Sequence, residues 1–193
     1  MTQTTAKKRV STKAIIKQWR EFYLQYFGLE IDLSTVKIPR LKKSYDRLNI
    51  IAQGLTLKRV LEAMRKVFMV WTAYDNDDLD KAITSIRNTE KSYTIRVKDS
   101  IEPDQEYLGK SADEADLHQK LGITLLERLV LELKYFHETG EHLDIKGWTL
   151  CTGSRFGSSY VPGVRWNPCY RGVYVSCGSS GFACSGNGLR SVV

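Results

Sequence analysis

Residues 149–193 of this chain contain no Lys, Asp or Glu, and no part of the chain contains a long apolar run. A helix needs roughly 20 apolar residues to cross a bilayer, and no stretch approaches that length. The N-terminus, MTQTTAKKRVSTKAIIKQW, has a basic start but neither the apolar core nor the cleavage site of a secretory signal. These absences predict a cytoplasmic protein without a membrane span, and they leave surface display or export by another route open.

Cysteine is scarce, and none of its four residues belongs to a C-x-x-C pair: Cys151, Cys169, Cys177 and Cys184. Their spacing matches no common zinc-binding pattern. In a chain without a secretion signal they are interpreted first as free thiols, with a zinc site as the remote alternative.

Motifs that carry catalysis are missing as well. The sequence has no P-loop, dinucleotide-binding fingerprint, HExxH or GxSxG motif, and none of its three histidines accompanies a nucleophile. Three clustered aspartates, Asp75, Asp77 and Asp78, lack the glycine and glutamate of an EF-hand loop and are predicted to lie in a solvated loop. We therefore expect no enzymatic activity, no cofactor and no metal site.

The net charge of +7 is unevenly spread, because residues 1–60 hold 13 Lys and Arg against 4 Asp and Glu. A basic region can bind nucleic acid or an acidic partner, although it is more often a solvated face. The basic cluster between positions 40 and 47 contains Tyr45 as its one aromatic residue, so it does not resemble a stacking platform for bases. Nucleic-acid binding through the first 60 residues is the alternative function.

Three segments have the apolar spacing of helices. The first is Ser11–Phe27, with its apolar residues on one face. A second begins after Thr56, a candidate N-cap, and its apolar positions continue to Phe68. The third runs from about Leu125 to Glu138 behind a capping box that begins at Thr124, and its apolar residues are expected to line one face.

Strands are predicted for Arg47–Ala52 and Ser92–Lys98, and short strands are predicted from residue 148 to the C-terminus. Residues 71–80 and 99–121 are polar and are predicted to be loops, with a short helix near Ser111. The fold class is α+β, with two main helices on a small mixed or antiparallel sheet. A basic N-terminal helix and connector, residues 1–44, is expected to pack on a domain of residues 45–193.

The composition changes sharply near residue 148. In residues 149–193 arginine is the only charged residue type, and Ser, Gly, Tyr, Cys and Asn replace Lys and Glu. This segment has too few large apolar residues to be entirely buried. A surface of Tyr, Ser, Gly, Asn and Arg is typical of a binding paratope. The alternative is that Gly- and Ser-rich β structure uses fewer Lys and Glu.

Two strands in this segment alternate between apolar and polar positions, so each is predicted to have a core face and an outward face. The core-facing set is predicted to be Val164, Trp166, Val173, Val175 and Cys177. The outward set is predicted to be Gly163, Arg165, Asn167, Tyr174, Ser176 and Gly178. Leu189 and Val192 or Val193 are expected to close the last strand against the core.

A codon argument points in the same direction. If the adenines of AAC or AAT codons are replaced by any base, Lys, Glu, Gln, Met and Trp cannot be reached. These five types number 39 in residues 1–148 and one, Trp166, in residues 149–193, where the upstream frequency would give about a dozen. Trp166 falls on the predicted core face. The pattern favours a segment diversified at adenines.

Several segments carry a resemblance to a known family. They are FYLQYFGLEIDLS, YDRLNIIAQGLTL, GITLLERLVLELKYFHETGEHLDI, WTLCTGSRF, the strand VPGVRW and the terminal GLRSVV. In them the chain resembles variable proteins of diversity-generating retroelements, in particular uncharacterised proteins of candidate-phyla-radiation bacteria. The final Gly188-Leu189-Arg190 resembles the Gly-Phe-Arg ending of C-type-lectin folds of the formylglycine-generating type, with Leu189 in place of Phe.

The resemblance implies a C-type-lectin-like fold and a ligand-binding protein whose C-terminal region, about residues 153–188, is rewritten by reverse transcription with errors at adenines. It implies no formylglycine-generating activity, because the catalytic cysteine pair has no counterpart. The partner would be an unknown protein or cell-surface ligand. An enzyme using the thiol of Cys177 or Cys184 ranks last, behind nucleic-acid binding, because no base accompanies either thiol.

The variable, ligand-binding role is assigned through this resemblance to fifteen positions. They are Ser158, Ser159, Tyr160, Gly163, Arg165, Asn167, Cys169, Tyr170, Tyr174, Ser176, Ser179, Ser180, Phe182, Ser185 and Asn187. The invariant frame would consist of Val164, Trp166, Val173, Val175, Leu189 and Arg190.

Overall fold

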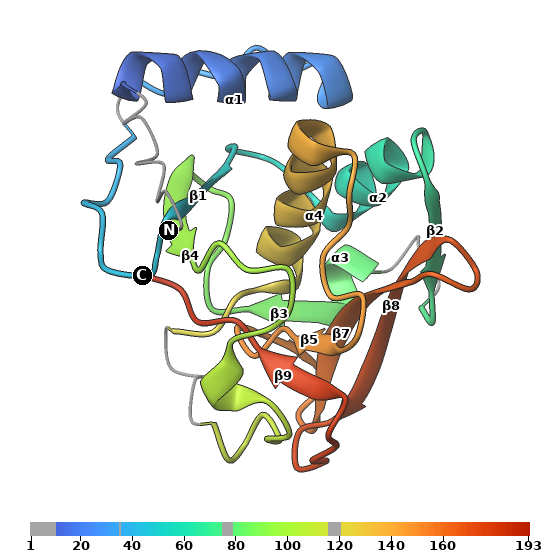
Figure 1. Ribbon diagram of the computed structural model, residues 1–193. Helices are drawn as coiled ribbons and strands as arrows, with labels where there is room; N and C mark the ends of the chain where they lie inside the picture. Colours follow the sequence, from blue (N-terminus) through green and yellow to red (C-terminus); the bar gives the residue numbers. More distant parts are fainter. Residues whose placement is uncertain (1–10, 35, 75–78, 116–120) are drawn as a thin grey trace, which may run out of the picture.

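The computed structural model describes residues 11–34, 36–74, 79–115 and 121–193. Helices form one side of the molecule and a strongly twisted sheet forms the other, as Figure 1 shows. Helix α1 (Thr12–Phe27) lies across the outer side of the helical layer, and α2 (Leu57–Arg65) and α4 (Leu125–Thr139) lie between it and the sheet. Helices and mixed strands together make an α+β fold, as the sequence predicts.

Helix α1 forms where the apolar spacing predicts it. The Ser11 side chain accepts a hydrogen bond from the backbone N–H of Ala14, and Gly28 ends the helix with a φ of 62°, a left-handed conformation that suits glycine. Its buried face includes Tyr23, whose hydroxyl donates to the Ile50 carbonyl at 2.7 Å and accepts from the Ala52 N–H at 3.1 Å. The helix is therefore fixed to the domain by hydrogen bonds as well as by apolar packing.

Helix α2 begins at the predicted N-cap, because the Thr56 side chain accepts from the Arg59 N–H. A second cap comes from Asp80 in the short helix α3 (Leu79–Ala82), whose carboxylate accepts from the N–H groups of Leu57 and Lys58 at 2.7 and 3.0 Å. A negative charge at a helix N-terminus is stabilising. The helix stops at Arg65, so the predicted extension to Phe68 is wrong.

Helix α4 confirms its predicted capping box and ends at Gly140. The expectation of a single apolar face is wrong, since polar and charged residues on the other sides are buried too. Their charges are paired, as for Glu127, whose carboxylate receives two hydrogen bonds from the Arg87 guanidinium. The reason is position: α4 packs against α2, against the larger sheet and against the small two-stranded sheet described next, so residues 127–134 are buried on every side and only the last turn of the helix is exposed.

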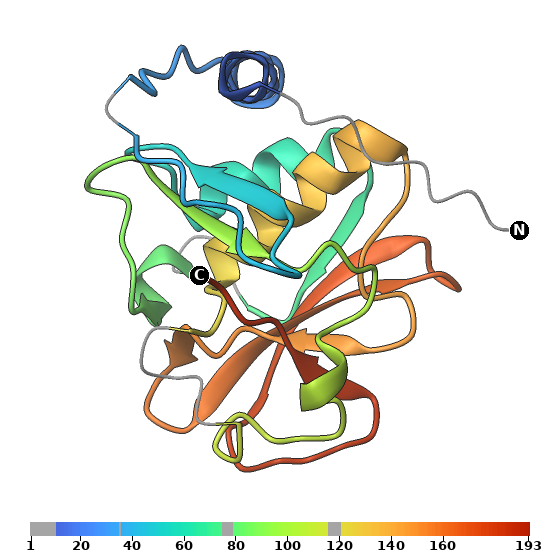
Figure 2. The ribbon, with the colours of Figure 1, turned by 60° about the vertical axis from the view of Figure 1, so that its left-hand side comes forward.

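A small antiparallel sheet joins β1 (Arg47–Ile51) to β4 (Tyr93–Val97), which confirms both predicted strands. The side chain of Asn49 donates to the Glu127 carbonyl at 2.8 Å and so connects this sheet to α4. Arg96 exchanges two backbone hydrogen bonds with Val193. The C-terminus therefore ends beside β4, as Figure 2 shows.

The larger sheet has the strand order β2-β8-β7-β5-β9. Its members are β2 (Met69–Thr72), β8 (Gly172–Ser179), β7 (Tyr160–Asn167), β5 (Trp148–Leu150) and β9 (Asn187–Leu189). The pairs β2·β8 and β5·β9 are parallel and the others on this path are antiparallel, so the sheet is mixed. Strand β3 (Ile83–Ser85) pairs with β6 (Ser154–Phe156), which in turn pairs with the start of β7.

Two loop predictions need correction. Residues 71–80 are not simply loop, since they contribute the end of β2 and the start of α3, because the apolar run before the acidic residues pairs with β8. The short helix predicted near Ser111 is instead a 3₁₀ turn, η1 (Gln105–Tyr107), followed by turns at residues 112–115. The aspartates at positions 75, 77 and 78 lie outside the described residues, so the structure does not bear on their predicted loop.

The larger sheet has apolar side chains packed on both faces. The main core lies between the sheet and the helices. A second, smaller cluster lies on the opposite face, where the segment 103–115 crosses the sheet, and it consists of Ala112, Leu150, Val161 and Leu189. Leu189 therefore packs on the outer face, not against the helices, whereas Val192 does enter the main core. In the described ranges no helix is both long and apolar enough to cross a membrane.

Candidate functional site

The core side of the β7–β8 hairpin has the side chains that the alternation predicts. Val164, Val173 and Val175 are fully buried in the main core. Trp166 is half-buried, and its ring lies parallel to the His142 imidazole with the ring centres 3.4 Å apart. His142 in turn contacts the buried Glu132 carboxylate through Nδ1 at 2.9 Å. These residues form a continuous contact between the hairpin and α4.

Arg190 is buried in an ionic network at the centre of the protein. Its guanidinium donates to the Asp144 carboxylate at 2.5 Å, to Thr149 Oγ1 at 3.1 Å and to the Ile101 carbonyl at 2.6 Å. Arg128 donates to the same carboxylate at 2.7 Å. Burial alone would raise the pKa of Asp144, but the two guanidinium groups hold that pKa below its ordinary value. Arg190 is therefore held inside the protein by paired charge and hydrogen bonds.

Part of the outer face forms what we call the turn-end patch, around the turn that joins β7 to β8. It consists of Met69, Trp71, Trp148, Arg165, Asn167, Cys169, Tyr170, Arg171 and Tyr174. The Trp71 and Tyr174 rings stack with their centres 6.2 Å apart. The Tyr170 ring also contacts Tyr174, with 6.2 Å between the two ring centres. The Arg165 guanidinium lies 5.6 Å from the Trp148 ring centre. The patch therefore combines aromatic rings with positive charge.

The turn itself is organised by Asn167. Its side-chain oxygen accepts hydrogen bonds from the N–H groups of Cys169 and Tyr170 at 3.0 and 3.4 Å, as in an Asx turn. Arg171 has a φ of 48°, which is the left-handed region. Asn167 is half-buried, so this predicted ligand-binding residue has a structural task in the turn, whereas Tyr170 is 67% exposed.

The opposite end of the hairpin forms a second surface, the loop-end patch. It consists of Ser158, Ser159, Tyr160, Ser179, Ser180 and Phe182, whereas Ser185, which is exposed, precedes β9 near Trp148. Tyr160 is 50% and Phe182 59% exposed. Ser180 donates from its hydroxyl to the Asp113 carboxylate at 3.0 Å, and its carbonyl accepts from the Asp113 N–H at 3.1 Å. These bonds hold the C-terminal loop beside the 105–115 segment, as Figure 2 shows.

The fold does not bring all fifteen predicted positions into one contiguous surface. The two patches lie at opposite ends of an eight-residue strand pair, which at the usual rise per residue separates them by roughly 20 Å. Ser176 lies between them and is half-buried, and its carbonyl accepts from the Tyr74 hydroxyl at 3.1 Å. Asn187 lies on β9 beside Trp148 and is half-buried as well. A single ligand of small size would therefore contact one patch or the other.

Gly163 is buried, so its predicted place on the displayed surface is wrong. A Cβ atom at this position would lie 3.3 Å from the Trp148 ring and 3.6 Å from the Leu150 side chain. The alternation along β7 identified the correct side of the strand. At this point, however, the neighbouring strand β5 and the cluster around Leu189 cover that side.

Two exposed side chains of the turn-end patch were missed by the sequence analysis. Met69 and Trp71 are 56% and 54% exposed, and both lie on β2 in register with Gly172 and Tyr174 of β8. The run MVWT contains the β-branched and aromatic residues that strands favour. This composition could have identified β2 as a strand. The acidic, turn-like residues that follow it obscured that signal.

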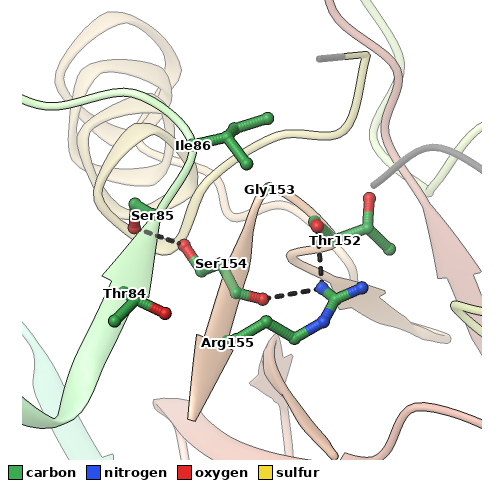
Figure 3. Close-up of a pocket in the computed structure, with 7 residues that line it drawn as sticks. All are labelled: Thr84, Ser85, Ile86, Thr152, Gly153, Ser154 and Arg155. Atoms are coloured by element: carbon green, nitrogen blue, oxygen red, sulfur yellow. Dashed lines mark hydrogen bonds between the residues drawn. The ribbon is translucent and has the colours of Figure 1, made fainter. Parts of the chain in front are cut away.

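A surface pocket of about 330 Å³ lies between β3 and β6, and Figure 3 shows its lining residues. The hydroxyls of Ser85 and Ser154 are 2.8 Å apart, and the Arg155 guanidinium donates to the carbonyls of Thr152 and Ser154 at 2.8 and 2.9 Å. Ser154 also accepts from the Leu125 N–H at the start of α4. Most of these polar groups hold the protein's own backbone, so the pocket is part of the scaffold.

The thiols differ in environment. Cys151 is buried, and burial raises the pKa of its thiol, which keeps it protonated at neutral pH. Cys169 and Cys184 are exposed, Cys177 is half-buried, and all four are free. Among the described residues no group of three or more His, Cys, Asp or Glu side chains is arranged to hold a metal ion.

Several basic side chains in the N-terminal part have local partners. Arg47 forms ion pairs with Asp99 at 2.8 Å and Glu138 at 2.6 Å, and Lys17 lies 3.8 Å from Glu21. Residues 1–10, which include further basic residues, lie outside the described part. Nucleic-acid binding through this region therefore stays a prediction.

Comparison with known proteins identifies no relative. No protein-family model matches the chain, and no similar sequence is found among curated proteins. No solved structure matches it either.

Proposed function

We propose that this chain is a ligand-binding protein with a C-type-lectin-like scaffold and a diversifiable C-terminal surface. The observation that carries the proposal is the division of residues 149–193 into two kinds of position. Core positions hold apolar or ion-paired side chains, whereas the exposed and half-buried positions at the two ends of the hairpin hold mostly Tyr, Ser, Cys, Phe and Arg. Trp166, which adenine replacement in AAC or AAT codons cannot produce, lies among the core positions.

The last strand supports the resemblance to C-type-lectin folds. Gly188 has no room for a side chain, because a Cβ atom there would lie 2.6 Å from the Pro103 side chain. Leu189 is buried in the second cluster, and Arg190 is held in the central ionic network. Each residue of this Gly-Leu-Arg ending thus has a distinct structural task, as a conserved ending of a fold would require.

The physical basis of a diversifiable surface is that its side chains contribute little to folding. Substitutions at exposed positions usually change stability by about 0.5 kcal/mol or less, whereas buried substitutions commonly cost several times more. The fold's stability comes from the main core and the second cluster, to which Tyr170, Phe182 and Ser158 do not belong. Such positions can change identity while the protein remains folded.

A library experiment tests this directly. One library places codons obtained from AAC or AAT by replacing the adenines with any base at six exposed positions of the two patches. A matched library places the same codons at six buried positions of the same hairpin and of the last strand. We expect most members of the first library to resist proteolysis at the level of the parent and most members of the second to be degraded. Equal loss of folding in both libraries would contradict a diversifiable surface.

The gene neighbourhood provides an independent test of the origin of this surface. We expect a near-copy of the stretch encoding residues 153–188, differing at adenines, beside a reverse-transcriptase gene. If the locus contains no such copy, diversification by a retroelement is wrong, while a ligand-binding role of the surface can still be tested by binding.

A further inference from the structure

The turn-end patch carries two arginines that form no ion pair within the part of the chain that the structure describes. Arg165 and Arg171 are half-buried and exposed, respectively, and within the described residues neither lies within ion-pair distance of a carboxylate. The nearby Glu102 carboxylate accepts hydrogen bonds from the N–H groups of Lys146 and Gly147; it keeps its negative charge there but forms no ion pair with Arg165 or Arg171. A partner with carboxylates would supply the missing counter-charge, since guanidinium and carboxylate groups form strong paired hydrogen bonds.

The loop-end patch is less positive. Asp113 is exposed and its carboxylate is bonded to Ser180 within the patch, whereas the charge of the neighbouring Glu114 is partly offset by the exposed Lys110. An acidic partner would be repelled there and attracted at the turn end, because like charges across an interface are unfavourable. The charge distribution therefore favours one end of the hairpin for an acidic ligand.

Trp71 gives the turn-end patch an apolar contact that diversification would not alter. It lies on β2, outside the variable segment, and is more than half exposed although tryptophan is among the largest apolar side chains. One side of its ring is covered by Tyr174, and β2 is the last strand of its sheet, so the other side lies at the sheet edge. Exposed Trp, Tyr and Arg residues that lie together are the residue types that dominate binding energy at protein interfaces.

We propose, building on the ligand-binding function above, that the turn-end patch binds an acidic polypeptide surface and that Trp71 is its constant anchor. An aromatic or aliphatic side chain of the partner packs against Trp71, and its carboxylates pair with Arg165 and Arg171. Variation at positions 165, 170 and 174 then changes selectivity around a fixed apolar contact, so successive ligands share this acidic and apolar character.

The ring arrangement favours a polypeptide over a single-stranded nucleic acid. Bases bind by stacking on free ring faces, but the facing sides of Trp71 and Tyr174 already cover one another. What the patch offers is one ring face at the sheet edge together with ring edges and guanidinium groups. This arrangement suits side chains of a protein partner better than successive bases.

The test uses the full chain and a random peptide library displayed on phage as the probe. We expect the selected peptides to be acidic and to contain aromatic or aliphatic residues. Trp71→Ala and Arg165→Glu should each weaken binding of a selected peptide by about tenfold or more, since interface anchors commonly contribute at least that much. Phe182→Ala, at the loop end, is the matched control and should leave binding unchanged. Circular dichroism and thermal unfolding verify that all three variants are folded.

Several outcomes would overturn the proposal. One is that no peptide is selected, or that the selected peptides are neutral or basic. Another is that Trp71→Ala binds a selected peptide as tightly as the parent. A third is that the parent protein binds an oligo(dT) strand and that the Trp71→Ala and Arg165→Glu variants lose this binding. If binding instead depends on Phe182 and Tyr160, the proposed ligand-binding function survives and the assignment of the ligand to the turn end fails. The two failures are thus distinguishable.

Discussion

The two faces of the β7–β8 hairpin contain the same strands but differ in what covers them. On the core face, Val164, Trp166 and Val175 meet the helices along the hairpin. On the outer face, the segment 103–115 and β5 cover Val161 and Gly163, whereas Tyr174 and Arg165 remain partly open to solvent. Alternation along a strand therefore identifies the side on which a residue lies, and a separate tertiary contact decides whether that side meets water.

The largest difference between the faces is expected from a pair of arginines. Arg190→Met should destabilise the protein by about 3–5 kcal/mol, because it removes one of the two guanidinium groups that neutralise the buried Asp144 carboxylate. Arg165→Met, on the outer face, should change stability by about 0.5 kcal/mol or less. Urea unfolding of the two variants measures both values. Equal effects would show that the central network is not what holds the C-terminal segment.

Acid should weaken the core side through the same network. The folded-state pKa of Asp144 lies below its unfolded value of about 4, so its contribution to stability is present above that pH and is lost as the pH falls through the folded pKa. We expect the free energy of unfolding to decrease below about pH 4, and Asp144→Asn to flatten this dependence. Asp113→Asn, at an exposed carboxylate, serves as the control. A wild-type protein as stable at pH 2 as at pH 6 would contradict this role.

Two glycines on the outer face provide the smallest and sharpest comparison. Gly163→Val should destabilise the protein by about 1–3 kcal/mol, because the new side chain would press on Trp148 and Leu150. Gly178→Val should be neutral or slightly stabilising, since no atom lies within 4 Å of a Cβ built there and strands favour β-branched residues. Thermal unfolding compares the two. If Gly163→Val is tolerated as well as Gly178→Val, the second cluster is looser than its packing indicates.

Much of the scaffold could be predicted from local signals. The boundaries of α1 and α4 follow from Ser11, Gly28 and the Thr124 capping box, which act within one helical turn. The alternation in β7 and β8 correctly assigned the valines to the core. The extent of α2 and the strand β2 were predicted poorly, because Phe68 and Trp71 continue an apolar spacing whose partner strand lies about a hundred residues away.

The sequence by itself determined the helices α1 and α4, the start of α2, the strands β1 and β4, the apolar side of β7 and β8, and that residues 149–193 differ chemically from the remainder. These properties depend on neighbours within a few positions along the chain. Only the tertiary structure decided that Gly163 is covered, that Trp71 is exposed beside Tyr174, and that the predicted surface divides between the two ends of the hairpin. Those outcomes depend on contacts such as the Asp104 N–H to the Leu189 carbonyl and Asp113 to Ser180, which join segments far apart in sequence and leave no periodic signal in it.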